Sequence, residues 1–295
     1  MLQILRPVAL ALVLALTAGP GDARESCAQH FAAARAPAIL DPKLSSDILP
    51  LCFAGFAVLH SGVSRTPLYA AERLTRASVA AARSVDRADA FHEEDRLPRG
   101  HRAALRDYVG SGYDRGHLAP AGDMPTGKAQ AESFSLANVV PQNRSANRSL
   151  WAAMEESVRR LAIRRGDIYV VTGPVFEGAT LSSINGRVLV PTRLYKAVHD
   201  PGRDEAAAYL AMNDSSGLWQ RVSIAKLTAI AGIDVFPGLS VRTKARAMDL
   251  PEPRALSRDE ARSRRRDEAP VASWLKNEIH RILRRMWRDF MRSIF

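Results

Sequence analysis

The stretch "YDRGHLAP", residues 113–120, places one histidine behind an aspartate, an arginine and a glycine, and a proline closes it. On an extended segment the side chains of Arg115 and His117 face the same side, because they are two positions apart. Asp114 faces the other way, where we expect it to hold the backbone. The guanidinium fork of Arg115 suits a phosphate, and a neutral imidazole can take a proton from water near neutral pH. A lone histidine is more often structural than catalytic, so the interpretation depends on partners elsewhere in the chain.

A helix is predicted for residues 144–166, "RSANRSLWAAMEESVRRLAIRRG", because apolar residues recur at helical spacing and Gly166 marks its end. Asn147 and Glu155 lie about 80° apart around the axis of this helix, so they broadly share one side. An amide oxygen can bind Mg²⁺ directly, and a carboxylate can hold the water shell of the ion. Hydrolysis of a phosphodiester needs a cation for its leaving oxygen, often a metal. Taken alone, such residues usually face solvent, and they gain meaning only beside His117.

Strand-like runs fill much of the rest of the chain. Residues 52–62 and 66–75 predict a pair of strands, and the polar residues 83–112 predict a long loop of the kind that is usually functional. Four further runs are separated by turn signals: 167–176, 187–200, 205–213 and 218–227. Strands that follow one another without helices between them indicate an antiparallel sheet, and the long helix makes this an α+β domain.

The chain has 295 residues, of which 46% are hydrophobic, enough for a core in one large domain or two small ones. Its formal net charge of +11 attracts polyanions such as nucleic acid, anionic membranes or acidic polymers. A basic surface is also a common aid to solubility. Charge therefore favours a polyanionic partner without selecting one.

The N-terminus predicts a secretory signal peptide over residues 1–23, with an arginine before an apolar run at 8–18 that is too short to span a bilayer comfortably. Small residues favour cleavage after Ala23, with Ala18 or Gly19 as alternative sites. A retained membrane anchor is the other interpretation. Because no other segment approaches about 20 apolar residues, we expect a soluble protein that is secreted or periplasmic.

Cys27 and Cys52 are the two cysteines, and both lie near the start of the domain expected over residues 24–250. In an oxidising compartment, two nearby cysteines predict one disulfide, which contributes about 3 kcal/mol by pinning the N-terminal segment. Two inert buried thiols or a metal pair are the alternatives. A zinc site lacks support, because the sequence has no CxxC or HxxxH partner.

The composition changes near residue 250. Residues 251–270 are charged and poor in large apolar residues, which is typical of a linker. Residues 271–295 carry an apolar stripe with arginines and a lysine largely off it, which predicts a basic amphipathic helix. The apolar face of this helix has three candidate partners: the domain itself, a second copy in a homodimer, or an anionic membrane surface.

Four motifs occur in a fixed order: "YDRGHLAP", "LANVVPQNRSANRSLWAAMEE", "VVTGPVF" and "GIDVFP". Together they resemble the DNA/RNA non-specific endonuclease family, over about residues 52–237. The tetrapeptide DRGH alone is a weak signal, but DRGH with the downstream Asn and Glu is specific. The resemblance implies a central antiparallel sheet flanked by helices, with a ββα-metal (His-Me finger) site. It also implies metal-dependent cleavage of DNA and RNA with little sequence specificity.

The resemblance assigns roles to individual residues. His117 takes the place of the general base that activates water, and Arg115 assists at the phosphate. Asn147 takes the place of the single direct protein ligand to Mg²⁺, for which Mn²⁺ or another divalent cation is an alternative. Glu155 would hold the water shell of the ion, and its spacing from Asn147 favours it over Glu156.

Two further residues are assigned in the same way. Asn138 would brace the site close to His117. Arg87 would bind near the scissile phosphate, with Arg83 as the alternative, because this loop varies within the family. The basic surface would hold the phosphate backbone without reading bases. A nucleic-acid-binding module without catalysis, and a membrane-associated protein that functions through its tail, are the competing hypotheses.

Overall fold

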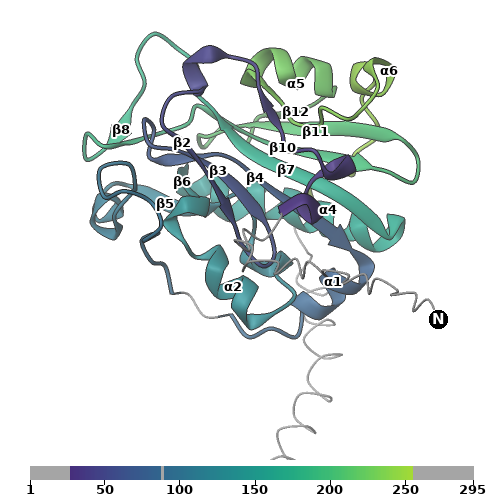
Figure 1. Cartoon of the computed structure of the whole chain (residues 1–295), viewed down its shortest axis with the longest axis horizontal. Coiled ribbons are helices and arrows are strands. Elements are labelled where there is room, and N and C mark those ends of the chain that lie inside the picture. The colour runs from purple at the N-terminus through teal and green to yellow at the C-terminus, as the bar shows by residue number, and fades with distance from the viewer. Residues whose placement is uncertain (1–26, 88–89, 255–295) are drawn as a thin grey trace, which may run out of the picture.

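The structure is a computed structural model, which describes residues 27–87 and 90–254 of the chain. One large sheet runs through the molecule, with helices against both of its faces (Figure 1). The predicted signal peptide (1–23), most of the predicted linker (251–270) and the predicted C-terminal helix (271–295) lie outside the described residues. Within the described part of the chain, no helix combines the length and apolar character needed to cross a membrane.

The large sheet has seven strands, and each neighbouring pair is antiparallel. Their spatial order is β12 (Trp219–Val222), β11 (Glu205–Met212), β10 (Arg193–Asp200), β7 (Asp167–Val175), β4 (Thr66–Thr75), β3 (Ala57–Ser61) and β2 (Ile48–Cys52). The short ladders are β1 (Ala38–Ile39) with β13 (Ile233–Asp234), β8 (Ser183–Ile184) with β9 (Val188–Leu189), and β5 (Tyr113–His117) with β6 (Val139–Asn143). The predicted α+β fold with a central antiparallel sheet is confirmed.

Three predicted strands differ from the structure in detail. The run 52–62 contains a sharp turn that separates β2 from β3, and the run 187–200 is divided between β9 and β10. The run 218–227 is a strand only in its first half. Ser223 then caps helix α5 (Ile224–Ala231) by accepting a hydrogen bond from a backbone amide in its first turn. A short apolar run fits a strand and a buried helix equally well, and the serine cap decides between them here.

Helices cover the two faces of the sheet. Helices α1 (Arg76–Ala82), α2 (Gly127–Ser133) and α4 (Ala152–Arg165) lie on one face, and α5 and α6 (Val241–Ala245) lie on the other (Figure 1). Helices α1 and α2 were not predicted, because seven residues are too few to display a periodicity. Short 3-10 turns link the elements: η2 (Ala32–Ala34), η3 (Pro42–Leu44), η4 (Leu105–Tyr108), η5 (Ala121–Asp123) and η6 (Leu136–Asn138).

The predicted long helix is continuous from residue 144 to residue 165. It comprises α3 (Arg144–Ala146), a π-turn over Asn147–Trp151, and α4. Gly166, with φ of +92°, ends it in a conformation that favours glycine. The apolar stripe of the helix packs on the sheet through Trp151, Met154, Val158, Leu161 and Ala162. This face of the sheet therefore carries the helix on which two of the predicted site residues lie.

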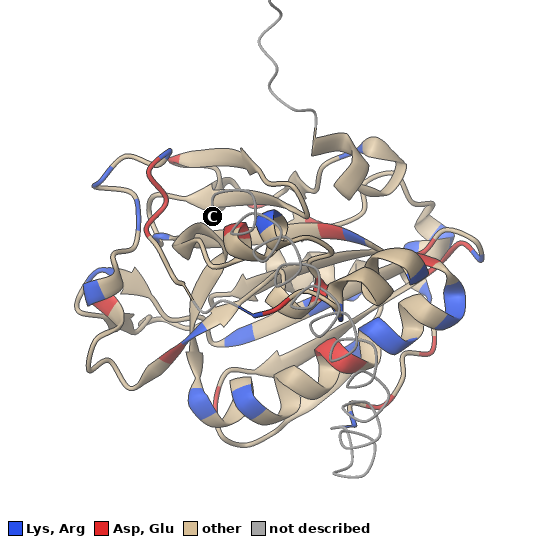
Figure 2. Cartoon of the chain, turned by 90° about the horizontal axis from the view of Figure 1, so that it is seen from below, with Lys and Arg blue, Asp and Glu red and all other residues tan. Residues whose placement is uncertain are grey.

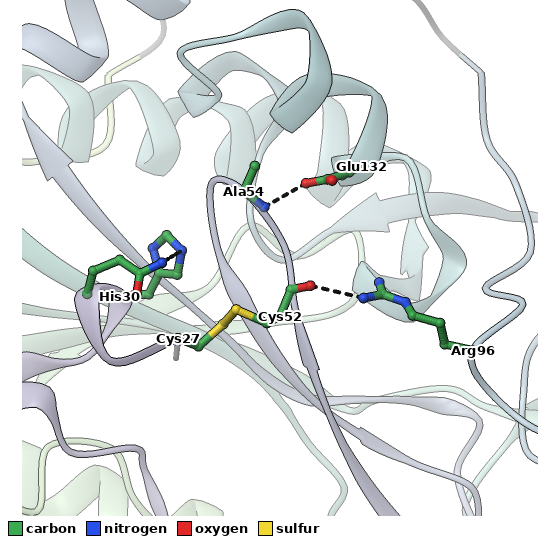
Figure 3. Close-up of a disulfide and its surroundings, with 7 residues drawn as sticks. Cys27, His30, Cys52, Ala54, Arg96 and Glu132 are labelled. Atoms are coloured by element: carbon green, nitrogen blue, oxygen red, sulfur yellow. Dashed lines mark hydrogen bonds between the residues drawn. A yellow bond between two sulfur atoms is a disulfide. The ribbon is translucent and has the colours of Figure 1, made fainter. Parts of the chain in front are cut away.

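The predicted disulfide joins Cys27, in the 3-10 turn η1 (Cys27–His30), to Cys52 at the end of β2 (Figure 3). The carbonyl of Cys52 accepts a hydrogen bond from Arg96 at 3.0 Å, and the Ala54 amide donates to the Glu132 carboxylate at 2.6 Å. The disulfide thus ties the N-terminal segment to an edge of the sheet. The neighbouring turn is held in addition by side chains from the loop and from α2.

Candidate active site

The segment 113–120 begins as β5, pairs with β6 in an antiparallel hairpin, and is followed by the long helix directly after β6. Gly116 permits this pairing. A Cβ atom at Gly116 would lie 2.1 Å from Oε1 of Gln142, a buried side chain on β6. Any larger residue would therefore push the two strands apart. The two strands, which are joined through residues 118–138 and helix α2, form one ββα unit with the helix that directly follows β6.

A hollow of about 730 Å³ opens where this unit meets the loop before β5. Six of the predicted site residues line it: Arg87, Asp114, Arg115, His117, Asn147 and Glu155. The alternatives Arg83 and Glu156 do not line it, and Glu156 pairs with Arg159 at 3.1 Å instead. The structure thus brings residues from three separate parts of the sequence, the loop before β5, β5 itself and the long helix, to one hollow.

Asp114 links the hairpin to the helix. The sequence predicts a backbone contact for this residue, whereas its carboxylate accepts from Asn147 Nδ2 at 3.0 Å and from Arg148 Nε and Nη2 at 2.8 and 2.9 Å. The difference arises because the helix brings the guanidinium of Arg148 to the carboxylate, and such bidentate pairs are strong. Burial raises the pKa of Asp114, but hydrogen bonds from Arg148 and Asn147 outweigh burial and hold this pKa below its usual range.

The contact with Asp114 also fixes the orientation of the Asn147 amide. Because Nδ2 donates to the carboxylate, the amide oxygen Oδ1 is the atom left for a ligand. Asn147 lines the hollow together with Glu155, two turns further along the helix. An amide oxygen and a carboxylate are donors that a hard divalent cation prefers. These residues therefore fit the metal that the sequence predicts.

Two phenylalanines that the sequence analysis missed surround His117. The imidazole lies 5.1 Å from the ring centroid of Phe91 and 5.0 Å from that of Phe134, which it meets edge-on. Arg115 stacks its guanidinium on Phe91 at 4.3 Å, and Arg87 lies over Phe134 at 5.4 Å. Arg115 and His117 therefore share one side of β5 and one aromatic neighbour. Phe91 lies in the predicted loop, where the sequence carries no periodicity that would reveal a contact.

Asn138 lies beneath the hollow and does not line it. Its Oδ1 accepts from the Ala119 amide at 2.9 Å, and its Nδ2 donates to the carbonyls of Ala119 and Ser133 at 2.8 and 2.9 Å. The Leu118 amide donates to the backbone carbonyl of Asn138 at 2.9 Å. The contacts with Ala119 and Leu118 hold the two residues that follow His117, and the contact with Ser133 fixes the Asn138 amide itself.

Arg159 is a further residue of the hollow that the sequence analysis missed. It follows Glu155 by four residues, so the two share one helix face, and this spacing was the available signal. Its guanidinium donates to Asp123 at 2.8 Å and to Glu156 at 3.1 Å. Burial raises the pKa of Glu155, although the charges of Lys196 and Arg159 oppose the rise.

The long helix, seen in front of the sheet in Figure 2, carries its two acidic residues side by side, with arginines before and after them. Near the hollow, Asp114 and Asp123 are engaged by arginines of this helix. Arg87 and Arg115 line the hollow from the side of the loop and β5. The hollow thus has cationic groups on two sides, an arrangement that suits a phosphate diester.

A family model described as DNA/RNA non-specific endonuclease matches residues 39–242. The chain is 36% identical over 181 residues to Nuclease C1 of Cunninghamella echinulata var. echinulata, a match that covers 57% of this chain and 71% of that protein. It is 32% identical over 209 residues to the mitochondrial nuclease EXOG of Xenopus laevis, covering 63% of this chain and 58% of that protein. The chain thus spans less than two thirds of the length of EXOG.

The fold is also similar to a solved structure. A chain in a crystal structure of the EndoG/EndoGI complex superposes with a TM-score of 0.62 at 27% sequence identity. The match covers 71% of this chain and 94% of the matched chain. The similarity therefore extends over nearly all of that chain.

Proposed function

Because the chain belongs to the DNA/RNA non-specific endonuclease family, a group of divalent-metal-dependent nucleases, we propose that His117 acts as its general base and that Asn147 holds one Mg²⁺. The substrate would be the phosphodiester backbone of DNA and RNA, cut with little sequence specificity. The observation that carries the proposal is that His117 and Asn147, from different elements, line one hollow together with Arg115 and Glu155.

His117 would take the proton from the attacking water. Its ring is set between Phe91 and Phe134, which limit how it can turn, and Asn138 holds the backbone just beyond it. A base held in one orientation loses less freedom in the transition state. Arg115, stacked on Phe91, would meet the phosphate from the same side of β5.

The metal would be held by Oδ1 of Asn147, with its water shell received by Glu155. When bound, a divalent cation supplies positive charge for the phosphate and the leaving oxygen. Asp114 keeps the Asn147 amide in the required orientation, which is the part that second-sphere carboxylates play at other metal sites. Arg87, which lines the hollow from the loop, would add a contact near the scissile phosphate.

The test is digestion of plasmid DNA and of RNA with the purified protein, in a series of divalent cations. We expect cleavage of both with Mg²⁺, loss of cleavage with EDTA, and near-complete loss in His117→Ala. His92→Ala is the matched control, because His92 is exposed and does not line the hollow. Tight, salt-sensitive binding without any cleavage by the wild-type protein would refute catalysis and leave a binding module.

We further propose that the protein is exported, since a disulfide is stable in an oxidising compartment. Fractionation of the native host with mass spectrometry of the N-terminus tests this, and the expected mature protein starts after Ala23.

Attachment to anionic membranes would depend on residues 271–295. Flotation with liposomes, with and without these residues, tests attachment, and equal flotation of both forms would refute it. Sedimentation of the same two proteins tests a homodimer formed through that segment.

A further inference from the structure

A polar stripe crosses the otherwise apolar face of the sheet that packs against α4. Glu72 on β4, Thr172 on β7 and Lys196 on β10 lie on three adjacent strands, and each is 1% exposed. Lys196 is directly opposite Thr172 in the ladder. Their surroundings are the core residues Ala70, Leu74, Val170, Leu194 and Val198. Buried charges are costly unless they are paired and hydrogen-bonded, so the contacts of this stripe identify its role.

The ammonium of Lys196 contacts both halves of the site. Nζ donates to Thr172 Oγ1 at 2.7 Å and to the carbonyl of Leu118 at 3.3 Å. It also lies 5.4 Å from the ring centroid of Trp151, within range of a cation–π contact. Leu118 directly follows His117. Trp151 lies on the helix four residues after Asn147 and four before Glu155, so it shares their helix face.

We propose that Lys196 is a positioning residue, which fixes the backbone after His117 relative to the helix that carries Asn147 and Glu155. This inference rests on the proposed function of those three residues. A lysine suits the task, because one ammonium offers three donors in different directions. Thr172 anchors the ammonium to the central strand, while Leu118 and Trp151 belong to the two segments that it joins.

Glu72 is the acidic residue of the stripe, and the charge of Lys196 acts on it. Its two carboxylate oxygens have no hydrogen-bond partner among residues 27–87 and 90–254. Burial raises the pKa of Glu72 well above its usual range and Asp123 adds to the rise, while the charge of Lys196 opposes it. Replacement of two buried ionisable groups together by apolar residues of similar volume is often neutral for stability. Removal of both groups therefore separates a stabilising role of Lys196 from a positioning role.

The experiment compares Lys196→Met, the double variant Glu72→Met/Lys196→Met, and the wild type. Tyr195→Phe is the control, because Tyr195 is buried on the other face of the same strand and belongs to the core beneath α5. We expect Lys196→Met to melt at a lower temperature and the double variant to recover most of the loss. In plasmid cleavage at saturating Mg²⁺, kcat is expected to fall at least about tenfold in both Lys196 variants, because small misplacements of reacting groups are costly. KM should stay within about twofold, since Lys196 is buried below the hollow and does not touch the substrate.

A second readout does not depend on cleavage. Hydrogen–deuterium exchange of the peptide that contains residues 117–120 should be faster in the double variant than in the wild type, even where the melting temperatures agree. Exchange at wild-type rates in that peptide, or a double variant with wild-type kcat, would overturn the inference. Absence of cleavage by the wild type would refute the proposed function instead, and the exchange measurement would still decide whether Lys196 holds this segment.

Discussion

His60 makes the folding stability depend on pH, and the size of the effect follows from its burial. The residue lies on β3 and is 0% exposed. Its Nε2 donates to the carbonyl of His101 at 2.9 Å, and Nδ1 has no partner among the described residues. Burial lowers the pKa of His60 from 6.5 to about 4, although the hydrogen bond to His101 opposes the shift. The folded protein therefore keeps this ring neutral at a pH where the unfolded chain would protonate it.

The sign follows from the order of the two pKa values. As the pH falls through 6.5 the unfolded chain takes up a proton at His60, and the folded chain takes it up only near pH 4. Stability that is fully present above pH 6.5 is therefore lost over this window. The shift corresponds to a loss of about 2 kcal/mol between pH 7 and pH 5, and of about 3 kcal/mol in total below pH 4.

The assay is urea unfolding of the wild type and of His60→Gln at pH 7 and pH 5. Glutamine can still donate to the His101 carbonyl but does not titrate, so the variant should lose about 2 kcal/mol less than the wild type over this interval. Other buried groups titrate equally in both proteins and cancel in the difference. His92→Gln, at an exposed histidine, should follow the wild type. Equal losses in wild type and His60→Gln would refute the reasoning, because burial would then not be keeping the ring neutral.

Three further predictions concern the site and the disulfide. Asp114→Ala should raise the Mg²⁺ concentration needed for half-maximal cleavage by about tenfold or more, because the amide of Asn147 loses its acceptor; a metal titration at fixed substrate measures this. Gly116→Ala should lower the melting temperature and abolish cleavage, because its Cβ would lie 2.1 Å from a buried glutamine of β6; a melt at wild-type temperature would contradict the close approach. Cys27→Ser with Cys52→Ser should cost about 3 kcal/mol in urea unfolding, and cleavage at 25 °C should persist because the disulfide lies away from the hollow.

The parts of the site that lie close together in the sequence could be predicted from it. Helical periodicity places Asn147 and Glu155 on the long helix, and the two-residue alternation of a strand places Arg115 and His117 on one side of β5. Gly166 marked the end of the helix because its positive φ is a local requirement. Such signals depend only on residues nearby in the sequence, so contacts with the rest of the fold do not alter them.

The remaining parts of the site depend on contacts across the fold. Phe91 meets His117 from a loop without periodicity, and Lys196 reaches the site from a strand that reads as an ordinary apolar run with one lysine. An isolated lysine in a strand normally indicates a solvent-facing position. Lys196 is buried instead, because α4 covers this face of the sheet. The alternation of side chains along a strand does not indicate which of its faces a helix will cover. The second half of the run 218–227 differs for a local reason, because a short apolar run fits a strand and a helix equally well and the Ser223 cap decides for the helix.

The site combines local elements with contacts from distant strands, and this affects how His117 is held in place. The ββα unit supplies the groups proposed to react, but a two-stranded hairpin is marginally stable by itself in water. Its precision must come from the sheet beneath it. Asn138 and Lys196 hold the backbone at Ala119 and Leu118 from two different elements, one from the 3-10 turn η6 just before β6 and one from strand β10 of the large sheet. A segment held at consecutive residues by two buried groups cannot pivot about either one. The placement of His117 is therefore a property of the whole sheet, and changes at β10 should reach it without touching the hollow.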